Sequence, residues 1–493
     1  MIFGLFKKSV TADIVFKGGR IYTLDADLPW AEAVACKDGR IIAVGDNDTV
    51  ENFEGSDTEV VDLDGGVLLP GFIDTCAHPV LQAFQSVCLI LYDDMPISEV
   101  LDTLQAYIVK NPGKSGYFAY GFNTELILNK PAEETQLLLD NICMDKPVAM
   151  LDISGTEGWF NTKAMDLVRA AVAEESETPV ITLSYVLHVL SPINFDLLQN
   201  AVIALAAEYC KKGYTTVFDC GSPDYLHAIY QEMLVEMLQV DMLKQRFIGS
   251  YLITRNIAPD YIIRKLLQKQ TSCAEIEDCI SCSTLKLIVV HLDQAPDSVR
   301  ISKDMLKILA IKAAERGFKV HIDAVGKGSV TEALEAVFLA RAAGNRKAHF
   351  IIAHSHNLTE QEKIELLHNN EVCEAIPTLG DFHKKYRNID NADDVADAID
   401  KLTIDAAVQL GISDEYGSIE NGKRADFVIF KENPLSGDLQ RFRGLSAAMT
   451  VIEGNIVYEA GEDNPESWQA ILKEGQQEIQ KQILLEEEED PMY

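Results

Sequence analysis

From Gly66 onward, short apolar runs alternate with helical patterns, and several of the apolar runs end in side chains that can bind metal ions. The first run extends from Gly66 to Pro79 and ends with Cys76 and His78. Because alternate residues of a strand point to one face, these two side chains project together past the strand's end. The alternation predicts βα units and a parallel sheet. In a β/α barrel, the carboxyl ends of the strands carry the chemistry.

Three later runs repeat this arrangement. The run 285–291 contains Lys286, the run 318–326 contains His321, and the run 350–356 contains His354. Neutral imidazole is the commonest metal ligand in proteins, so histidines at successive strand ends indicate a shared site. A lysine within a parallel strand is costly to bury without a partner. Lys286 is therefore either a functional amine inside the barrel or a strand-end lysine whose ammonium group reaches solvent.

The sequence Gly-Phe-Ile-Asp at 71–74, followed by x-x-x-His-Pro, resembles the first-strand motif of the amidohydrolase superfamily, and most closely that of amidohydrolase family 3. That family usually has His-x-His where this chain has Cys76-Ala77-His78. Cysteine also binds zinc. Cys76 is then a ligand of the usual site, a ligand of a one-metal site, or a small buried residue in a site that has lost its metal.

The resemblance implies a set of site residues. His321 lies in a segment similar to the family's His-Ala-x-Gly-Asp motif on strand five, and His354 lies in one similar to strand six. A lysine such as Lys286 can be carbamylated in the superfamily and bridge two metals. The expected ligands of a divalent metal, with zinc favoured if Cys76 takes part, are therefore Cys76, His78, Lys286, His321 and His354.

One element of the family pattern is missing. After the seventh apolar run, 371–378, the family has a helix and an eighth strand that ends in the aspartate general base. Here the chain passes within 17 residues to a helical pattern over 395–410, so strand eight looks deleted. A metal-dependent hydrolase needs a group that takes a proton from water. Asp381 follows strand seven directly and is the expected surrogate base, ahead of His383, Asp323 and His356.

Both ends of the chain read as β structure. Residues 12–65 contain short strand-like runs, with Asp38-Gly39 as a hairpin signal, and residues 412–460 contain further strands. The resemblance implies that these ends form one small β-sandwich beside a barrel at 66–411. The expected fold is α/β: a (β/α) barrel, distorted or missing one strand, with a composite β-sandwich. An acidic helix and tail would follow at 461–493.

The composition of the chain limits the classes of molecule that it is expected to bind. The 493 residues include 43 basic and 77 acidic side chains, a net charge of −34, which argues against nucleic acid and anionic membranes. The N-terminus lacks the pattern of a secretory signal, and no stretch of 18 uncharged apolar residues occurs. A cytoplasmic protein with a small-molecule substrate is expected, and a homodimer is compatible with these features.

The sequence thus predicts a metal-dependent hydrolase of carbon–nitrogen bonds other than peptide bonds. The alternative is an amidohydrolase fold with impaired catalysis that binds a ligand or a partner. The retained residues His78, Lys286, His321 and His354 favour the hydrolase. The replaced first histidine, Thr156 in place of a further family histidine, and the missing strand-eight aspartate favour the alternative.

Overall fold

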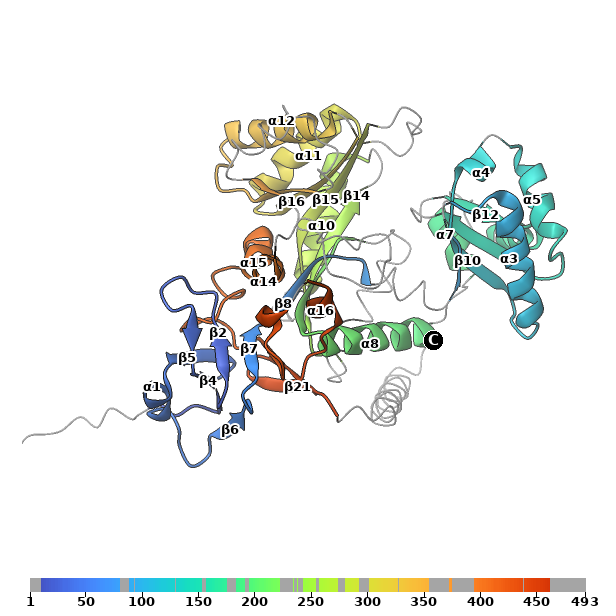
Figure 1. The fold of residues 1–493 in the computed structure, drawn as a ribbon. Coiled ribbons are helices and arrows are strands. Elements are labelled where there is room, and N and C mark those ends of the chain that lie inside the picture. The colour runs from blue at the N-terminus through green and yellow to red at the C-terminus, as the bar shows by residue number, and fades with distance from the viewer. Residues whose placement is uncertain are drawn as a thin grey trace, which may run out of the picture. The chain divides into compact units, whose positions relative to one another are not determined.

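The computed structural model forms two compact units (Figure 1). The first unit comprises residues 1–78, 206–221 and 237–493, and the second comprises 79–205 and 222–236. The predicted domain boundaries at residues 65 and 411 stay predictions. The structure describes residues 10–79, 88–92, 94–128, 130–152, 157–174, 183–190, 195–221, 234, 237, 243–253, 257–273, 280–291, 301–326, 328–353, 372–374, 394–437 and 439–461.

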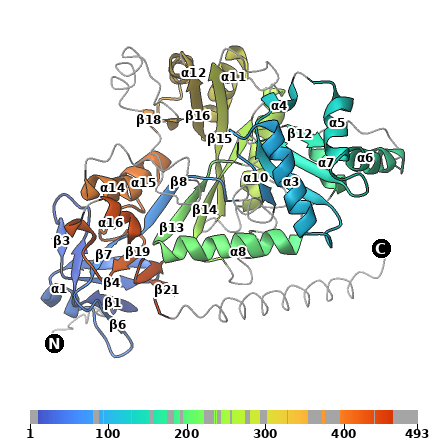
Figure 2. The same ribbon diagram turned by 45° about the vertical axis from the view of Figure 1, so that its right-hand side comes forward.

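A sheet of seven parallel strands forms the centre of the first unit. Its spatial order is β18-β17-β16-β15-β14-β13-β8. Each strand of this sheet therefore lies next to the strand of the sheet that precedes or follows it along the chain. The sheet curls like part of a barrel (Figure 2), which confirms the expected α/β class. Its strands are β8 (Phe72–Ala77), β13 (Tyr214–Asp219), β14 (Arg246–Ile253), β15 (Ile280–His291), β16 (Lys319–Gly326), β17 (Phe350–Ala353) and β18 (Val372–Glu374).

Helices cover this sheet. Helices α10 (Pro259–Cys273), α11 (Lys303–Glu315) and α12 (Ser329–Ala342) follow β14, β15 and β16, and α11 and α12 lie side by side against β16. Helix α11 begins where the Ser302 side chain accepts a hydrogen bond from the Met305 amide, a typical N-cap. Strand β17 is buried along its whole length, as expected for a parallel strand covered on both faces. The sheet therefore has a buried, well-defined backbone on which site residues can be placed.

The edges of the sheet are bridged by a helix. The single helix predicted over 395–410 is instead two helices, α14 (Val395–Leu402) and α15 (Ile404–Leu410). The break falls at Thr403, whose buried hydroxyl donates to the Ile399 carbonyl at 2.5 Å and so competes with the helical ladder. Helix α15 contacts both edge strands, β8 and β18. Within the described ranges no eighth strand joins the sheet, and residues 375–393, where the deletion was inferred, lie outside them.

Helix α15 packs its apolar side into the sheet and is held at its C-terminal end. Ala406, Ala407 and Leu410 share a core with Ile73 and Phe218 of the sheet. The ammonium group of Lys319 donates to the Leu410 carbonyl, and His349 Nε2 lies 2.5 Å from the Gln409 carbonyl. Donors at a helix C-terminus satisfy its last carbonyls.

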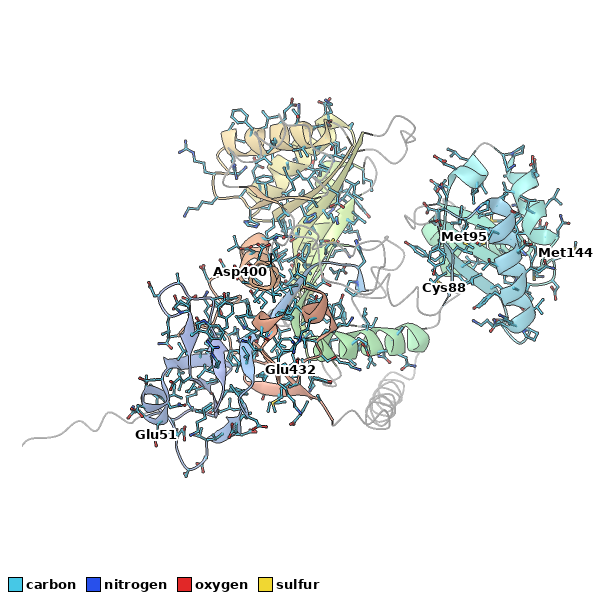
Figure 3. The ribbon with its side chains drawn as sticks, viewed as in Figure 1. Glu51, Cys88, Met95, Met144, Asp400 and Glu432 are labelled. Atoms are coloured by element: carbon cyan, nitrogen blue, oxygen red, sulfur yellow. The ribbon has the colours of Figure 1, made fainter. Side chains whose placement is uncertain are left out.

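The side chain of Asp400 on α14 is labelled in Figure 3. Burial and neighbouring aspartates raise its pKa.

Strands from both chain ends make two further sheets with a shared apolar core. One sheet has the order β5-β4-β1-β6, and the other has the order β21-β20-β19-β7-β2-β3. Phe16 of the first sheet and Phe427 of the second meet edge to face, with ring centroids 5.7 Å apart. Their elements are β1 (Ile14–Lys17), β2 (Arg20–Tyr22), β3 (Trp30–Ala31), β4 (Ala33–Lys37), β5 (Arg40–Gly45), α1 (Asn47–Glu51), β6 (Glu59–Asp62), β7 (Val67–Pro70), β19 (Phe427–Phe430), η4 (Pro434–Ser436), α16 (Leu439–Gly444), β20 (Met449–Ile452) and β21 (Asn455–Glu459).

The second unit has its own sheet, of order β12-β11-β10-β9, and its own core. Trp159 is buried there, and its Nε1–H donates to the Thr135 carbonyl at 2.8 Å. Met144 is 72% exposed on this unit (Figure 3). Its elements are β9 (Leu89–Ile90), α3 (Ile97–Lys110), β10 (Tyr117–Phe122), α4 (Glu125–Leu128), α5 (Ala132–Asp140), β11 (Val148–Asp152), β12 (Gly158–Phe160), α6 (Thr162–Glu174) and α7 (Leu183–Leu190), and α8 (Phe195–Lys211) continues into the first unit. None of the helices in the described ranges has the length and apolar character needed to cross a bilayer.

Candidate active site

Strands β15 and β16 place three ionisable side chains next to one another. The two strands are parallel and in register, with Lys286 opposite His321 and Ile288 opposite Asp323. Lys286 Nζ lies 3.0 Å from Asp323 Oδ2, and His321 Nδ1 lies 3.5 Å from Asp323 Oδ1. All three side chains are at least nine-tenths buried. Lys286 is thus a buried ammonium ion with a carboxylate partner, and the alternative of a strand-end lysine that reaches solvent is wrong.

The charges around Lys286 explain its protonation. Burial alone would lower the pKa of the ammonium group, but the negative charge of Asp323 outweighs burial and raises this pKa. A protonated amine has no lone pair with which to attack carbon dioxide. Carbamylation of Lys286 therefore requires that the ammonium ion first lose both Asp323 and its proton. The ring of Phe218 packs beside His321, with centroids 5.8 Å apart, and completes an apolar wall.

His78, one residue past β8, has the orientation of a metal-binding imidazole. Its Nδ1 lies 2.8 Å from the carbonyl oxygen of Gly221. A carbonyl can only accept, so Nδ1 carries the proton in the neutral ring, and the lone pair lies on Nε2. Metal-ligating histidines typically donate their other ring nitrogen in this way. The geometry of His78 is therefore suited to binding a metal through Nε2.

Two thiols lie beside this group. They belong to Cys76, in β8, and Cys220, one residue past β13. The neighbouring Cys220 and the charge of Lys286 lower the pKa of Cys76, whereas burial raises that of Cys220. Asp74 supports the Cys76 backbone by accepting from its amide at 3.0 Å, and burial raises the pKa of Asp74 to about 6.

The structure brings some of the expected site residues together and leaves others undescribed. Cys76 and Lys286 are close enough to influence each other's pKa. Lys286 is also paired with Asp323, which lies beside His321. His354 and the surrogate base Asp381 lie outside the described residues, as does Thr156. Thiol, imidazole and carboxylate are all donors that zinc accepts, so the donor chemistry fits. Among the described side chains, however, no three are arranged to hold one ion.

Two residues of this group were not singled out by the sequence patterns. The sequence placed Asp323 only among the secondary candidates for a base. Cys220 was missed as well, although it follows an apolar strand just as His78 does. Its strand-end position was the available signal.

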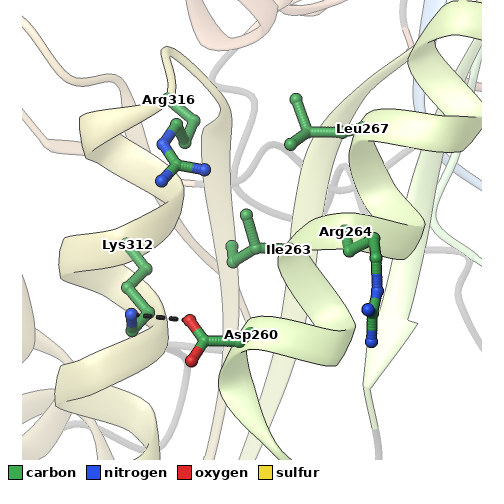
Figure 4. Close-up of a pocket in the computed structure, with 6 residues that line it drawn as sticks. All are labelled: Asp260, Ile263, Arg264, Leu267, Lys312 and Arg316. Atoms are coloured by element: carbon green, nitrogen blue, oxygen red, sulfur yellow. Dashed lines mark hydrogen bonds and ion pairs between the residues drawn. The ribbon is translucent and has the colours of Figure 1, made fainter.

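A surface pocket lies elsewhere on the first unit, between α10 and α11 (Figure 4). It is lined by Asp260, Ile263, Arg264, Leu267, Lys312 and Arg316. Lys312 donates to Asp260 at 2.8 Å across it. The pocket lies on the helical layer and contains none of the strand-end residues. It is therefore separate from the candidate metal ligands.

Comparison with known proteins identifies the family. The model of the "Amidohydrolase family" matches residues 59–378 and 374–458. The exoenzymes regulatory protein AepA of Pectobacterium carotovorum subsp. carotovorum is 25% identical over 415 residues, which cover 78% of this chain and 89% of that protein. The N-substituted formamide deformylase of Arthrobacter pascens is 30% identical over 159 residues, 32% of this chain and 29% of its own.

The solved structures agree on the fold. An adenosine deaminase from Xanthomonas campestris, with bound zinc, superposes with a TM-score of 0.54 at 15% identity, covering 96% of this chain and 99% of that one. Such a likeness shows the fold, whereas the family model spans the strand ends on which the candidate site is built. The chain therefore belongs to the amidohydrolase family, whose function is the metal-dependent hydrolysis of carbon–nitrogen bonds.

Proposed function

We propose that this chain is an active hydrolase that cleaves a carbon–nitrogen bond, other than a peptide bond, in a small amide. The metal would be zinc, held by residues from the set Cys76, His78, His321 and His354, and by Lys286 only once its ammonium group has lost its proton. The enzyme would act in the cytoplasm, and the acidic composition of the chain supports a protein that does not bind nucleic acid or membranes. A homodimer is compatible with the proposal.

The observation that carries the proposal is the orientation of His78. Its Nδ1 hydrogen bond to the Gly221 carbonyl places the lone pair of the neutral ring on Nε2, and His78 lies at the carboxyl end of β8. In a β/α barrel this end of the strands is where active sites lie.

The chain's own residues would then supply fixed charges, exclude water and accept a proton. Zinc, when bound, would polarise the amide carbonyl and make water a better nucleophile. Lys286 and Asp323 keep a fixed pair of opposite charges beside the ligand candidates, where the low dielectric strengthens their effect. Phe218 and helix α15 exclude water from the inner side of the sheet. Asp381 remains the proposed proton acceptor.

The test is hydrolysis of a panel of N-acyl and N-formyl amides by the full chain. We expect turnover that is lost after dialysis against a chelator, restored by zinc, and lost in His78→Ala. His349→Gln is the matched control. His349 also bonds a backbone carbonyl through one ring nitrogen, but it lies at the amino end of β17. Turnover that survives both chelation and His78→Ala would refute the proposal.

The Lys286–Asp323 ion pair supports a second candidate function. A buried ammonium ion on Asp323 supplies positive charge from within the chain itself. A site of this kind could bind an anionic or carbonyl-containing ligand without hydrolysing it. This binding function predicts no amide turnover, no zinc in the purified protein, and a rise in unfolding temperature when carboxylate or amide ligands are added.

A further inference from the structure

Asp219, the last residue of β13, carries a buried carboxyl group with a defined backbone partner. Its Oδ1 accepts a hydrogen bond from the Gly221 amide at 2.8 Å, and the residue is only 1% exposed. Its backbone carbonyl accepts from the buried Ser250 hydroxyl of β14 at 2.8 Å. The other carboxyl oxygen, Oδ2, is buried and has no hydrogen-bond partner in the part of the chain that the structure describes. Burying a carboxyl group with one oxygen unsatisfied costs free energy, so the place of Asp219 calls for an explanation.

Gly221 connects Asp219 to His78. Its N–H donates to Asp219, and its carbonyl oxygen accepts the Nδ1 proton of His78 at 2.8 Å. Because both groups belong to one residue, the bond that holds the N–H limits the directions in which the carbonyl can point. Gly221 has φ +94°, a conformation that favours glycine. A Cβ there would lie 2.7 Å from Leu252 Cβ, so β14 packs directly against this backbone.

A backbone bond keeps the two segments aligned. The Cys220 amide donates to the Ala77 carbonyl at 2.7 Å. Ala77 and Cys220 directly precede His78 and Gly221, so the imidazole and its carbonyl acceptor lie one residue beyond a fixed point on each segment. The orientation of the His78 ring therefore depends on where the Gly221 carbonyl is held.

We propose that Asp219 is a positioning residue for the metal ligand His78. By holding the Gly221 amide, Asp219 keeps the Gly221 carbonyl in place, and this carbonyl keeps His78 in the tautomer that has its proton on Nδ1 and its lone pair on Nε2. Partners behind ligating histidines fix the tautomer and the ring orientation in this way. The consequence for zinc rests on the proposed function, whereas the consequence for the tautomer is a property of the chain without metal.

The first measurement is the tautomer of His78 in the metal-free, full-length chain. The chain is labelled with ¹⁵N-histidine and studied by NMR at a pH at which the ring is neutral, with His78→Gln to assign its signals. We expect the proton on Nδ1 in the wild type and a mixture of both tautomers in Asp219→Ala. Asp219→Asn should keep the wild-type tautomer, because its amide oxygen can accept the same hydrogen bond.

Asp140→Ala is the matched control. Asp140 is also a buried carboxylate that accepts a backbone amide, that of Thr162 at 2.9 Å, but it belongs to the second unit. This variant should leave the tautomer of His78 unchanged.

The second measurement is the zinc affinity of the same variants by titration. We expect Asp219→Ala to weaken zinc binding about 10- to 100-fold, and Asp219→Asn and Asp140→Ala to keep the wild-type affinity. A wild-type chain that binds no zinc would refute the proposed function, and the tautomer would still test Asp219.

Three results would overturn the inference. They are a wild-type His78 protonated on Nε2, a tautomer and zinc affinity unchanged in Asp219→Ala, and an equal loss of zinc affinity in Asp219→Ala and Asp140→Ala, which would indicate general destabilisation. The first is read on the wild-type chain, so it holds even if Asp219→Ala fails to fold. Asp219→Asn supplies a further test, since a loss of the wild-type tautomer in this variant would also reject the role of the accepting oxygen.

Discussion

Breaking the Lys286–Asp323 pair should destabilise the first unit strongly. At 3.0 Å, with both side chains buried, the attraction between the charges is about 5.5 kcal/mol at an effective dielectric constant of about 20. Removing one partner of such a pair leaves an uncompensated buried charge and costs about 3–5 kcal/mol. We therefore expect Lys286→Met and Asp323→Leu each to lower the free energy of unfolding by about 3–5 kcal/mol, whereas the double variant loses much less than the sum.

The assay is urea unfolding of the two single variants, the double variant and the wild type, followed by circular dichroism. Lys312→Met is the matched control. Lys312 also pairs with an aspartate, Asp260, at 2.8 Å, but both groups are exposed, so the change should be within about 0.5 kcal/mol. Single variants as mild as this control, or a double variant that loses the full sum, would refute the idea that the two charges hold each other in the sheet.

Three further predictions concern substitutions of single residues. Arg246→Met leaves buried Asp426, 2.9 Å away, without its cation and should cost about 3–5 kcal/mol in urea unfolding, and a loss below about 1 kcal/mol would contradict this. Burial raises the pKa of Asp219 to about 7, so the folded state retains a proton that the unfolded state releases near pH 4. Its contribution to stability therefore falls as pH rises from about 4 to 7, by up to about 4 kcal/mol, and in Asp219→Asn this loss should disappear from the pH profile of unfolding. Gly213 has φ +86°, and a Cβ there would lie 2.3 Å from Val428 Cγ2, so Gly213→Ala should lower the thermal midpoint measurably, whereas an unchanged midpoint would show that the site relaxes freely.

Local signals were readable from the sequence. Asp38-Gly39 predicted a hairpin, and the structure pairs β4 with β5 around that turn, with both residues at positive φ. The parallel sheet followed from the alternation of apolar runs and helical patterns, because helices packed on a parallel sheet bury the apolar surface of both. Residues such as Lys286 and His321 could be placed on successive strands for the same reason.

The features that could not be predicted from the sequence are those that depend on strand register and on residues far apart in the chain. The pairing of Lys286 with Asp323 requires β15 and β16 to align at one particular offset. The bulge in β8 between Asp74 and Ala77, which shifts its register with β13, leaves no mark on the sequence. Likewise, periodicity continued through Thr403, where the backbone leaves helical geometry with φ −129° and ψ −94° and divides the predicted helix in two.

The central claim is that this chain holds a metal at the carboxyl end of its sheet. The most direct measurement is the metal content of the purified full-length chain by elemental mass spectrometry, in the wild type, His78→Ala and the control His349→Gln. We expect zinc bound in stoichiometric amount in the wild type, retained in His349→Gln and lost in His78→Ala, because His78 directs its Nε2 lone pair from the end of β8 whereas His349 lies at the opposite end of its strand. A wild-type protein without metal, or a metal content unchanged by His78→Ala, would contradict the claim.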